Sequence, residues 1–235
     1  MLVLCEISAP CQTVLNTKEH GVPQNRPRVY FVCIRKDADQ GTFAWPEPLG
    51  APPGIDRFLD TREAVPKLTN EFAPPPKTQA ADTFDAKMEE LIDKGEQPLS
   101  GPYLFDVGCS KIWSRTMLDT SPCLMTKSRI WISHHGRELN LPEKCRLQGM
   151  DPRRLKVVVD EAEFAKQLGN TMSVNVLERI LAAALPAAGV AAALRDRWAS
   201  GEAAAALEAT RDCKLIYGCR SRSDSSVRRV KEVGV

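Results

Sequence analysis

Apolar and polar positions predict a pair of strands near the start of the chain. From Val14 to Ile34 an apolar run is followed by turn residues at 19–23 and then by a β-branched and aromatic run. This order is typical of two strands joined by a loop. It places residues 24–28 at the entrance of the second strand.

Helical spacing appears further along the chain. Residues 83–94 put Phe84, Met88, Leu91 and Ile92 on one face. At 141–149, a proline and a glutamate in the first turn predict a helix start. Residues 161–185 predict two helices separated by Gly169-Asn170, with Ser173 as the cap of the second.

Proline and alanine content changes the picture on either side of these helices. Ten of the seventeen prolines fall between 46 and 102, so we expect a loop-rich region there. Residues 181–210 contain fourteen alanines, which predicts helix up to Pro186 and again after it. The stretch beyond Cys219 has little apolar content, which is typical of a disordered tail.

Composition excludes several classes of protein. The 43% apolar and 26% charged content is that of a folded chain, and proline, glycine and arginine interrupt the longest apolar run before it reaches a membrane span. The start lacks the basic region of a signal peptide. Eight cysteines with no C-x-x-C pair and only three histidines argue against a zinc site or a disulfide framework, so we expect reduced thiols, no metal and an intracellular location.

The net charge of +2 conceals a segregation of charge. Residues 16–36 hold five basic and one acidic side chain, residues 126–156 hold eight and three, and the last 25 residues hold seven and three. Residues 37–106 hold six basic and fourteen acidic side chains. A localised basic surface that meets phosphates is one interpretation, and an ordinary solvated charged face is the other.

Three segments carry candidate chemistry. Gln24, Arg26 and Arg28 alternate, so on a strand their side chains would share one face and present an amide and two guanidiniums to a phosphate or a base edge. The alternative is a pair of edge arginines that keeps the strand soluble. Glu143 and Arg146 have the i, i+3 spacing of an ion pair on a helix surface.

The third segment is Gly169-Asn170, where glycine permits a tight turn and asparagine can bond either the backbone or a ligand. Considered alone, this segment is better explained as a helix cap.

Taken together, the three segments resemble the C-terminal conserved motifs of cytosine-5 DNA methyltransferases. The family has a G-x-P-Q-x-R-x-R strand motif, a variable target-recognition region, an R-x-L-x-x-x-E-x-x-R-L-Q-G segment and a final G-N helix. Here the strand motif is "GVPQNRPR" at 21–28, the R-x-L-x-x-x-E-x-x-R-L-Q-G segment is "RELNLPEKCRLQG" at 137–149, and the final G-N helix is "GNTMSVNV" at 169–176. The resemblance covers roughly residues 14–182.

The resemblance implies roles only at matching positions. Arg28 would help to hold a flipped cytosine, with Arg26 and Gln24 supporting the DNA-facing loop. Asn170, with Gly169, would border the S-adenosylmethionine pocket. The residues that would organise the recognition region and its backbone contacts are Arg137, Glu143, Arg146 and Gln148.

The chain also departs from the family pattern. Family members carry a glycine-containing cofactor loop, a Pro-Cys nucleophile and a Glu-Asn-Val acid, yet these 235 residues contain neither G-x-G nor E-N-V. "PCQ" at 10–12 spells the nucleophile motif, but Cys11 lies only thirteen residues before Gln24, which is too close for the helix and strand that normally intervene. We therefore expect Cys11 not to be the nucleophile.

The resemblance implies an α/β fold, made of an incomplete Rossmann-like S-adenosylmethionine-dependent methyltransferase domain, a loop-rich target-recognition lobe and an alanine-rich helical extension. The expected segments are a hairpin at 1–36, target recognition at 37–150, returning helices at 151–185, an alanine-rich helix at 186–212 and a basic tail at 213–235. The expected partners are DNA and a polypeptide supplying the N-terminal half, with no membrane. The expected compartment is the nucleus in a eukaryote and the cytoplasm in a bacterium.

Three functions stay open at this point. The chain is the C-terminal part of a DNA cytosine-5 methyltransferase that is inactive alone, or a catalytically inactive DNA-binding or regulatory module, or half of a split enzyme. An RNA cytosine methyltransferase of the same architecture is a further alternative.

Overall fold

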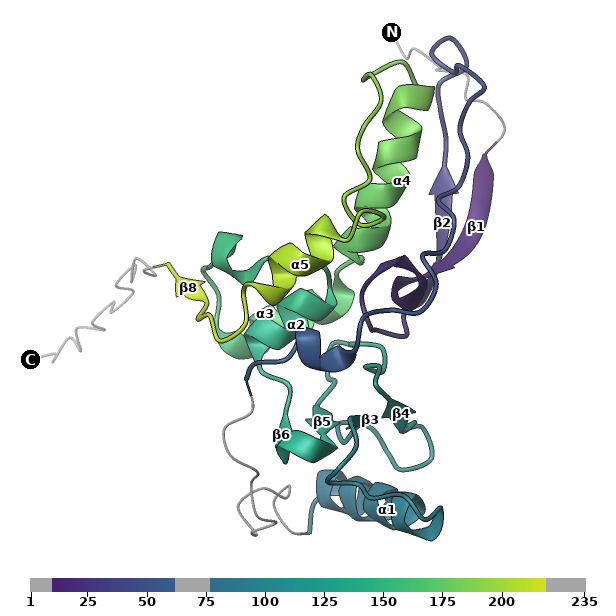
Figure 1. Cartoon of the computed structure of the whole chain (residues 1–235). Coiled ribbons are helices and arrows are strands. Elements are labelled where there is room, and N and C mark those ends of the chain that lie inside the picture. The colour runs from purple at the N-terminus through teal and green to yellow at the C-terminus, as the bar shows by residue number, and fades with distance from the viewer. Residues whose placement is uncertain (1–9, 62–76, 219–235) are drawn as a thin grey trace, which may run out of the picture.

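The computed structural model describes residues 10–61 and 77–218, which form helices and small sheets (Figure 1). The α-helices are α1 Gln79–Asp93, α2 Leu141–Leu147, α3 Glu161–Asn170, α4 Val174–Ala187 and α5 Glu202–Glu208. The strands are β1 Cys11–Asn16, β2 Pro27–Val32, β3 Tyr103–Asp106, β4 Met117–Leu118, β5 Ile130–Ile132, β6 Arg137–Glu138, β7 Lys156–Val157 and β8 Ile216–Tyr217. No helix in these ranges is long and apolar enough to cross a membrane.

Strands β1 and β2 form the predicted antiparallel pair, with Val14 opposite Val29. A 3-10 turn at Thr17–His20 and Gly21, whose φ is 92°, begin the connection between them. On the inner face, Leu15 and Tyr30 pack against α4. Figure 1 shows the hairpin and α4 side by side at one end of the molecule. The hairpin therefore packs against the helix that follows Ser173.

The outer face of this hairpin is apolar but uncovered. Val14, Val29 and Phe31 are 54–64% exposed. They point away from α4 because side chains alternate along a strand.

A four-stranded antiparallel sheet with the order β4-β3-β5-β6 lies at the other end of the molecule, next to α1 (Figure 1). Phe84 of α1 packs on Phe105 and Trp131 of this sheet. The helix begins at Gln79, earlier than predicted, because Thr78 caps it by accepting a hydrogen bond from the Ala81 amide. Its predicted apolar face is only partly buried, since Ile92 is exposed.

Helix α2 lies between the two ends of the molecule, close to α3 and α5 (Figure 1). As the sequence predicts, Pro142 and Glu143 lie in the first turn; Asn140 and Glu143 also form a capping box at its N-terminus. A core cluster joins this region to the other elements; it contains Val22, Ile55, Phe58, Leu59, Leu104, Leu124, Ile130, Ile132, Leu139, Leu147, Trp198, Ala203, Ala204 and Leu207. The segment boundaries proposed from the sequence stay predictions.

The break between α3 and α4 differs from the prediction. Gly169 and Asn170 are the last residues of α3, and the non-helical residues are 171–173. Ser173 occupies the N-cap position of α4 but makes no capping bond, because its hydroxyl instead bonds the Thr17 hydroxyl. Helix α4 continues through Pro186, where the lost hydrogen bond is confined to the last turn.

The alanine-rich segment 186–212 is not one helix, which corrects the prediction. Between residues 188 and 212 only α5 is helical, and Trp198 and Leu207 pack into the central core together with the alanines of α5. The start of the predicted tail is also ordered, since β8 pairs in parallel with β7. Residues 219–235 of that tail lie outside the described residues.

Candidate functional site

Gln24, Arg26 and Arg28 do not share one face of a strand, which corrects the sequence prediction. Strand β2 begins only at Pro27, and Gln24 makes an isolated bridge with Ser121 instead. Gln24 and Arg26 are buried, whereas Arg28 is exposed. The three side chains therefore cannot meet a common ligand, and Arg28 alone is available at the surface.

Arg26 joins three segments that are far apart in the sequence. Its Nη1 donates to the Leu124 carbonyl, and its Nη2 donates to the carbonyl oxygens of Gly169 at 3.0 Å and Thr171 at 2.6 Å. Burial lowers the pKa of this guanidinium, and the nearby Cys123 side chain opposes that effect. A planar fork can serve several carbonyls at once, which an ammonium cannot do as well. Arg26 thus fixes the hairpin connection to residues 124 and 169–171.

Two glutamines complete these junctions. Gln24 Nε2 donates to the Leu147 carbonyl at 3.1 Å, and Gln148 Nε2 donates to the Leu168 carbonyl at 2.7 Å. Both side chains are buried. The three motif segments found in the sequence therefore meet in space, through side-chain to backbone bonds.

Gly169 is required by a close approach of the backbone. A Cβ at this position would lie 2.4–2.5 Å from backbone atoms of Met125 and Thr126. The side chain of any other residue would force the backbone at residues 125–126 away from this position. Asn170 is exposed, and it lies between the two carbonyls, of Gly169 and Thr171, that Arg26 holds.

Arg28 extends from β2 beside Cys123. Its Nη2 lies 3.4 Å from the Cys123 Sγ, and its Nη1 donates to the Pro27 carbonyl at 2.7 Å. The same Sγ lies 3.3 Å from Arg26 Nη1, so one thiol contacts both guanidiniums. Two of the five N–H groups of Arg28 are used in this way, and the others can donate to a phosphate or a base.

Glu143 pairs with a residue other than the one predicted. Its carboxylate accepts two hydrogen bonds from Arg137, at 2.6 and 2.8 Å, and none from Arg146. It also accepts the backbone amides of Asn140 and Asp60. Burial acts to lower the pKa of Arg137, but the hydrogen bonds and charge of Glu143 outweigh it and raise that pKa.

Arg146 is fully buried and bonds a different set of groups. Its Nε donates to the Phe58 carbonyl at 2.6 Å, its Nη1 donates to the Thr210 carbonyl at 2.9 Å, and its Nη2 pairs with the Asp60 carboxylate. Burial acts to raise the pKa of Asp60, but hydrogen bonds from Asn140 and the Asp212 amide, together with Arg146, lower it. Arg146 therefore joins α2 to residues 58–60 and to the end of α5.

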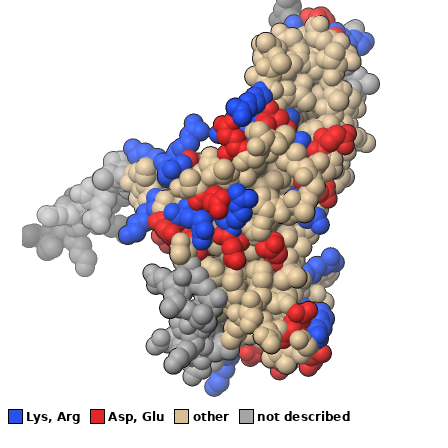
Figure 2. Space-filling model, viewed as in Figure 1, with Lys and Arg blue, Asp and Glu red and all other residues tan. Residues whose placement is uncertain are grey.

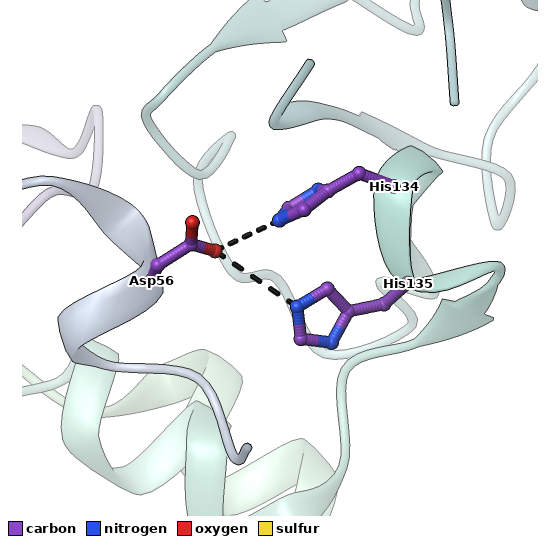
Figure 3. A group of neighbouring side chains, drawn as sticks. All are labelled: Asp56, His134 and His135. Carbon is purple, nitrogen blue, oxygen red and sulfur yellow. Dashed lines mark hydrogen bonds and ion pairs between the residues drawn. The ribbon is translucent and has the colours of Figure 1, made fainter. Parts of the chain in front are cut away.

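Asp56, His134 and His135 form a further polar group (Figure 3). Both Nε2 atoms face the Asp56 Oδ1, from 2.8 Å for His134 and 3.9 Å for His135. The spacing would suit a metal ion, but Arg137 Nη2 lies 3.3 Å from the Nδ1 of His135. A guanidinium can only donate, so the proton of His135 lies on Nε2, the atom that a metal would need. The geometry favours a hydrogen-bonded group.

The described residues do not enclose a cofactor by themselves. Asn170 lies at the surface, the Gly169 carbonyl is already bonded to Arg26, and the space at the Gly169 α-carbon is filled by backbone atoms of Met125 and Thr126. Cys11 is exposed on β1, opposite Val32.

On the face shown in Figure 2 the charged side chains do not form a basic surface, which was one of the two interpretations of the charge segregation. Among the coloured residues, Lys and Arg lie close to Asp and Glu over the middle of the molecule. The described residues also form ion pairs at the surface, for example Arg57 with Glu208 at 2.7 Å and Arg129 with Glu138 at 2.6 Å.

Sequence reasoning missed Cys123 and Asp60. Cys123 lies between two guanidiniums, and Asp60 bonds Arg146 and Asn140. Neither has a local sequence signal, because their partners are 80 or more positions away.

A sequence model of the C-5 cytosine-specific DNA methylase family matches residues 9–185. The type II methyltransferase M.HpaII of Haemophilus parainfluenzae is 28% identical, over 72% of this chain and 48% of its own length. The type II methyltransferase M.HaeII of Haemophilus aegyptius is 26% identical, over 71% of this chain and 48% of its own length. The type II methyltransferase M.HhaI of Haemophilus parahaemolyticus is 26% identical, over 71% and 50%. The chain spans about half the length of the curated relatives it matches.

Proposed function

Because the chain belongs to the C-5 cytosine-specific DNA methylase family, we propose that it carries the part of a DNA cytosine-5 methyltransferase that faces the target base. Members of this family transfer a methyl group from S-adenosylmethionine to C5 of cytosine. In this role Arg28 contacts the cytosine or its phosphates, and Asn170 forms one wall of the cofactor pocket.

The observation that carries this proposal is the different exposure of two neighbouring arginines. Arg26 is buried and bonds the carbonyls of Leu124, Gly169 and Thr171, whereas Arg28 projects into solvent with N–H groups to spare. A buried anchor two residues away holds the backbone that carries the exposed group. Such preorganisation is what recognition of an extruded base requires.

The remaining motif residues support the site without touching DNA in this proposal. Glu143, Arg146 and Gln148 are buried, and Gln24 is buried beside them. Their hydrogen bonds fix α2, α3 and the hairpin connection relative to one another. Arg137 is partly exposed but is bonded to Glu143 on both of its terminal nitrogens.

We propose further that methyl transfer needs parts that these 235 residues do not supply. The sequence has neither G-x-G nor E-N-V, and Cys11 lies on a hairpin strand. Without a nucleophile and an acid for N3, an extruded cytosine held by Arg28 would not be attacked at C6. These residues alone should therefore transfer no labelled methyl group to DNA.

A polypeptide that carries the missing motifs is the expected partner, either as a separate chain or as a continuation of this one. Mixing the chain with such an N-terminal half should restore methyl transfer to DNA. Transfer by these 235 residues alone that vanishes in Cys11→Ser would contradict the proposal and identify Cys11 as the nucleophile. Restored transfer to RNA but not to DNA would favour the RNA-directed alternative.

A catalytically inactive DNA-binding module is the second candidate function, and the same missing motifs favour it. No methyl transfer would be restored by the N-terminal half in that case, although DNA would still bind.

DNA binding by the chain tests the role of Arg28 directly. We expect weak, salt-dependent binding to a duplex, and Arg28→Ala should reduce both the affinity and the salt slope, the latter by about one unit. Arg195→Ala is the matched control, since Arg195 is exposed on the segment before α5. An unchanged affinity and salt slope in Arg28→Ala would refute the contact.

A further inference from the structure

The segment that follows α4 lies beyond the residues that the family model matches, yet it packs on the strand motif. The match ends at residue 185, and the Trp198 ring lies against Gly21, the first residue of "GVPQNRPR". A Cβ at Gly21 would lie 3.2 Å from that ring. Trp198 is 4% exposed and belongs to the same core cluster as Val22. The segment after α4 therefore covers the middle of the connection between β1 and β2.

Two residues of α4 hold this segment in place. The indole Nε1 of Trp198 donates to the Glu178 carboxylate at 2.7 Å, and Arg179 Nε donates to Asp196 Oδ2 at 2.7 Å. The other oxygen of Asp196 accepts the backbone amides of Trp198 and Ala199, both at 3.0 Å. Burial acts to raise the pKa of Asp196, but the hydrogen bonds from Arg179 and from these amides lower it. Asp196 is therefore a carboxylate that fixes the Trp198 backbone to α4.

Arg179 extends this contact to the hairpin connection. It is 5% exposed, and its Nη1 bonds the Nδ1 of His20. A guanidinium can only donate, so His20 accepts this bond. One turn earlier on α4, Asn175 donates through Nδ2 to the carbonyl oxygens of Thr17 at 3.1 Å and His20 at 2.9 Å. Both ends of the turn at Thr17–His20 are thereby bonded to α4.

The same turn contacts the residue that precedes β2. The amide and the hydroxyl of Thr17 both lie 3.4 Å from the Arg26 carbonyl oxygen, and Asn16 Oδ1 accepts the Arg26 amide at 2.9 Å. The exposed Arg28 follows two residues later. A displacement of the turn would therefore move the backbone from which Arg28 projects.

Resting on the DNA contact of Arg28 proposed above, we propose that Asp196 and Trp198 are positioning residues for that contact. Through Arg179 and His20 they hold the turn at 17–20, and the turn holds the backbone that carries Arg28. They touch no DNA in this role, since Trp198 is buried and both oxygens of Asp196 are bonded within the protein. A group that receives an extruded base must be held in a fixed geometry, which these contacts supply. The competing interpretation is that the segment after α4 only stabilises the fold.

A double-mutant cycle separates the two interpretations, with the affinity of the 235-residue chain for a labelled duplex as the readout. Asp196→Asn keeps an oxygen for the two amides but puts an N–H group or no acceptor opposite Arg179. We expect it to weaken binding about threefold, and we expect Arg28→Ala to have much less effect on affinity and salt slope in that background than in the native chain. Trp198→Phe, which keeps a ring on Gly21 but loses the bond to Glu178, should show the same coupling more weakly.

Glu202→Gln is the matched control, because it also removes one negative charge close to Asp196 in the sequence but pairs with two exposed arginines. It should leave the effect of Arg28→Ala unchanged. Circular dichroism checks that each variant is folded, and Trp198→Phe decides alone if Asp196→Asn does not fold. An undiminished effect of Arg28→Ala in the folded variants would overturn the proposal and leave the segment a stabilising role. If Arg28→Ala had no effect in the native chain, the proposed DNA contact itself would fail, and this inference with it.

Discussion

The guanidinium of Arg26 lies 3.0 Å from the carbonyl oxygen of Gly169, a residue 143 positions further along the chain. This contact joins the connection of the β1–β2 hairpin to the end of α3, next to the exposed Asn170. Arg28, two residues after Arg26, faces solvent. Stability and ligand contact are thereby divided between two arginines of one short motif.

We expect Arg26→Ala to lower the free energy of unfolding by about 2–5 kcal/mol, because it removes the donor to the buried carbonyls of Leu124 and Gly169 and to the partly buried carbonyl of Thr171. Arg26→Lys should recover only part of this loss, since lysine lacks the fork. Urea unfolding followed by circular dichroism measures both. Arg28→Ala is the control and should stay within about 0.5 kcal/mol of the native chain. Equal stabilities of the two alanine variants would show that the Arg26 network is unimportant.

Glu143→Ala should be among the most destabilising changes in α2. It removes both bonds to Arg137 and the acceptor of two backbone amides, so we expect a loss of about 3–5 kcal/mol. Asn140→Ala removes the capping bond to the Glu143 amide and the bond to Asp60, and should cost about 1–2 kcal/mol. Denaturant midpoints of the two variants compare them. A larger loss in Asn140→Ala would contradict this ranking.

His20 should make the protein less stable as the pH falls below 6.5. Burial, with help from the Arg179 guanidinium, lowers the pKa of His20 from 6.5 to about 4, and Asp196 opposes this only in part. Between these values the unfolded chain binds a proton that the folded chain does not, so unfolding becomes easier with acid. The stability is fully present above pH 6.5 and is lost as the pH falls toward 4, by about 1.4 kcal/mol for each pH unit at most.

Urea unfolding at pH 7 and pH 5 checks this dependence. His20→Gln, which keeps an acceptor for Arg179 but does not titrate, should flatten it. If the native chain and His20→Gln lost the same stability between these two pH values, another group would be responsible.

Phe31→Ser should change assembly more than folding. Phe31 lies with Val14 and Val29 on the uncovered face of the hairpin, and an apolar surface of this kind promotes association. We expect the variant to raise the soluble fraction of the chain alone and to weaken restoration of methyl transfer by an N-terminal half. Ile92→Ser on α1, an exposed apolar residue far from the hairpin, is the control. Light scattering measures association, and the methyl-transfer assay measures restoration. Full restoration with Phe31→Ser would show that the N-terminal half does not bind this face.

The sequence by itself determined the features that depend on neighbouring residues. The capping box at Asn140 and Glu143, the proline in the first turn of α2 and the hairpin between Val14 and Ile34 all follow from short-range signals. Helix boundaries were less well predicted, since α3 runs through Gly169 and Asn170, and after α4 ends at Ala187 the alanine-rich region contains only the short α5. A glycine and a run of alanines permit several local conformations, and packing selects one of them.

Only the tertiary structure decided which polar groups meet. At i, i+3 Glu143 could have paired with Arg146, but each side chain found a partner outside the helix, Arg137 for one and Asp60 for the other. Likewise, their alternate spacing predicted that Arg26 and Arg28 lie on the same face of a strand, whereas in the structure Arg26 is buried and Arg28 is exposed. An unpaired charge is costly to bury, so a buried guanidinium must hydrogen-bond to acceptors that the folded chain brings near it. The spacing of residues in the sequence does not specify which acceptors these are.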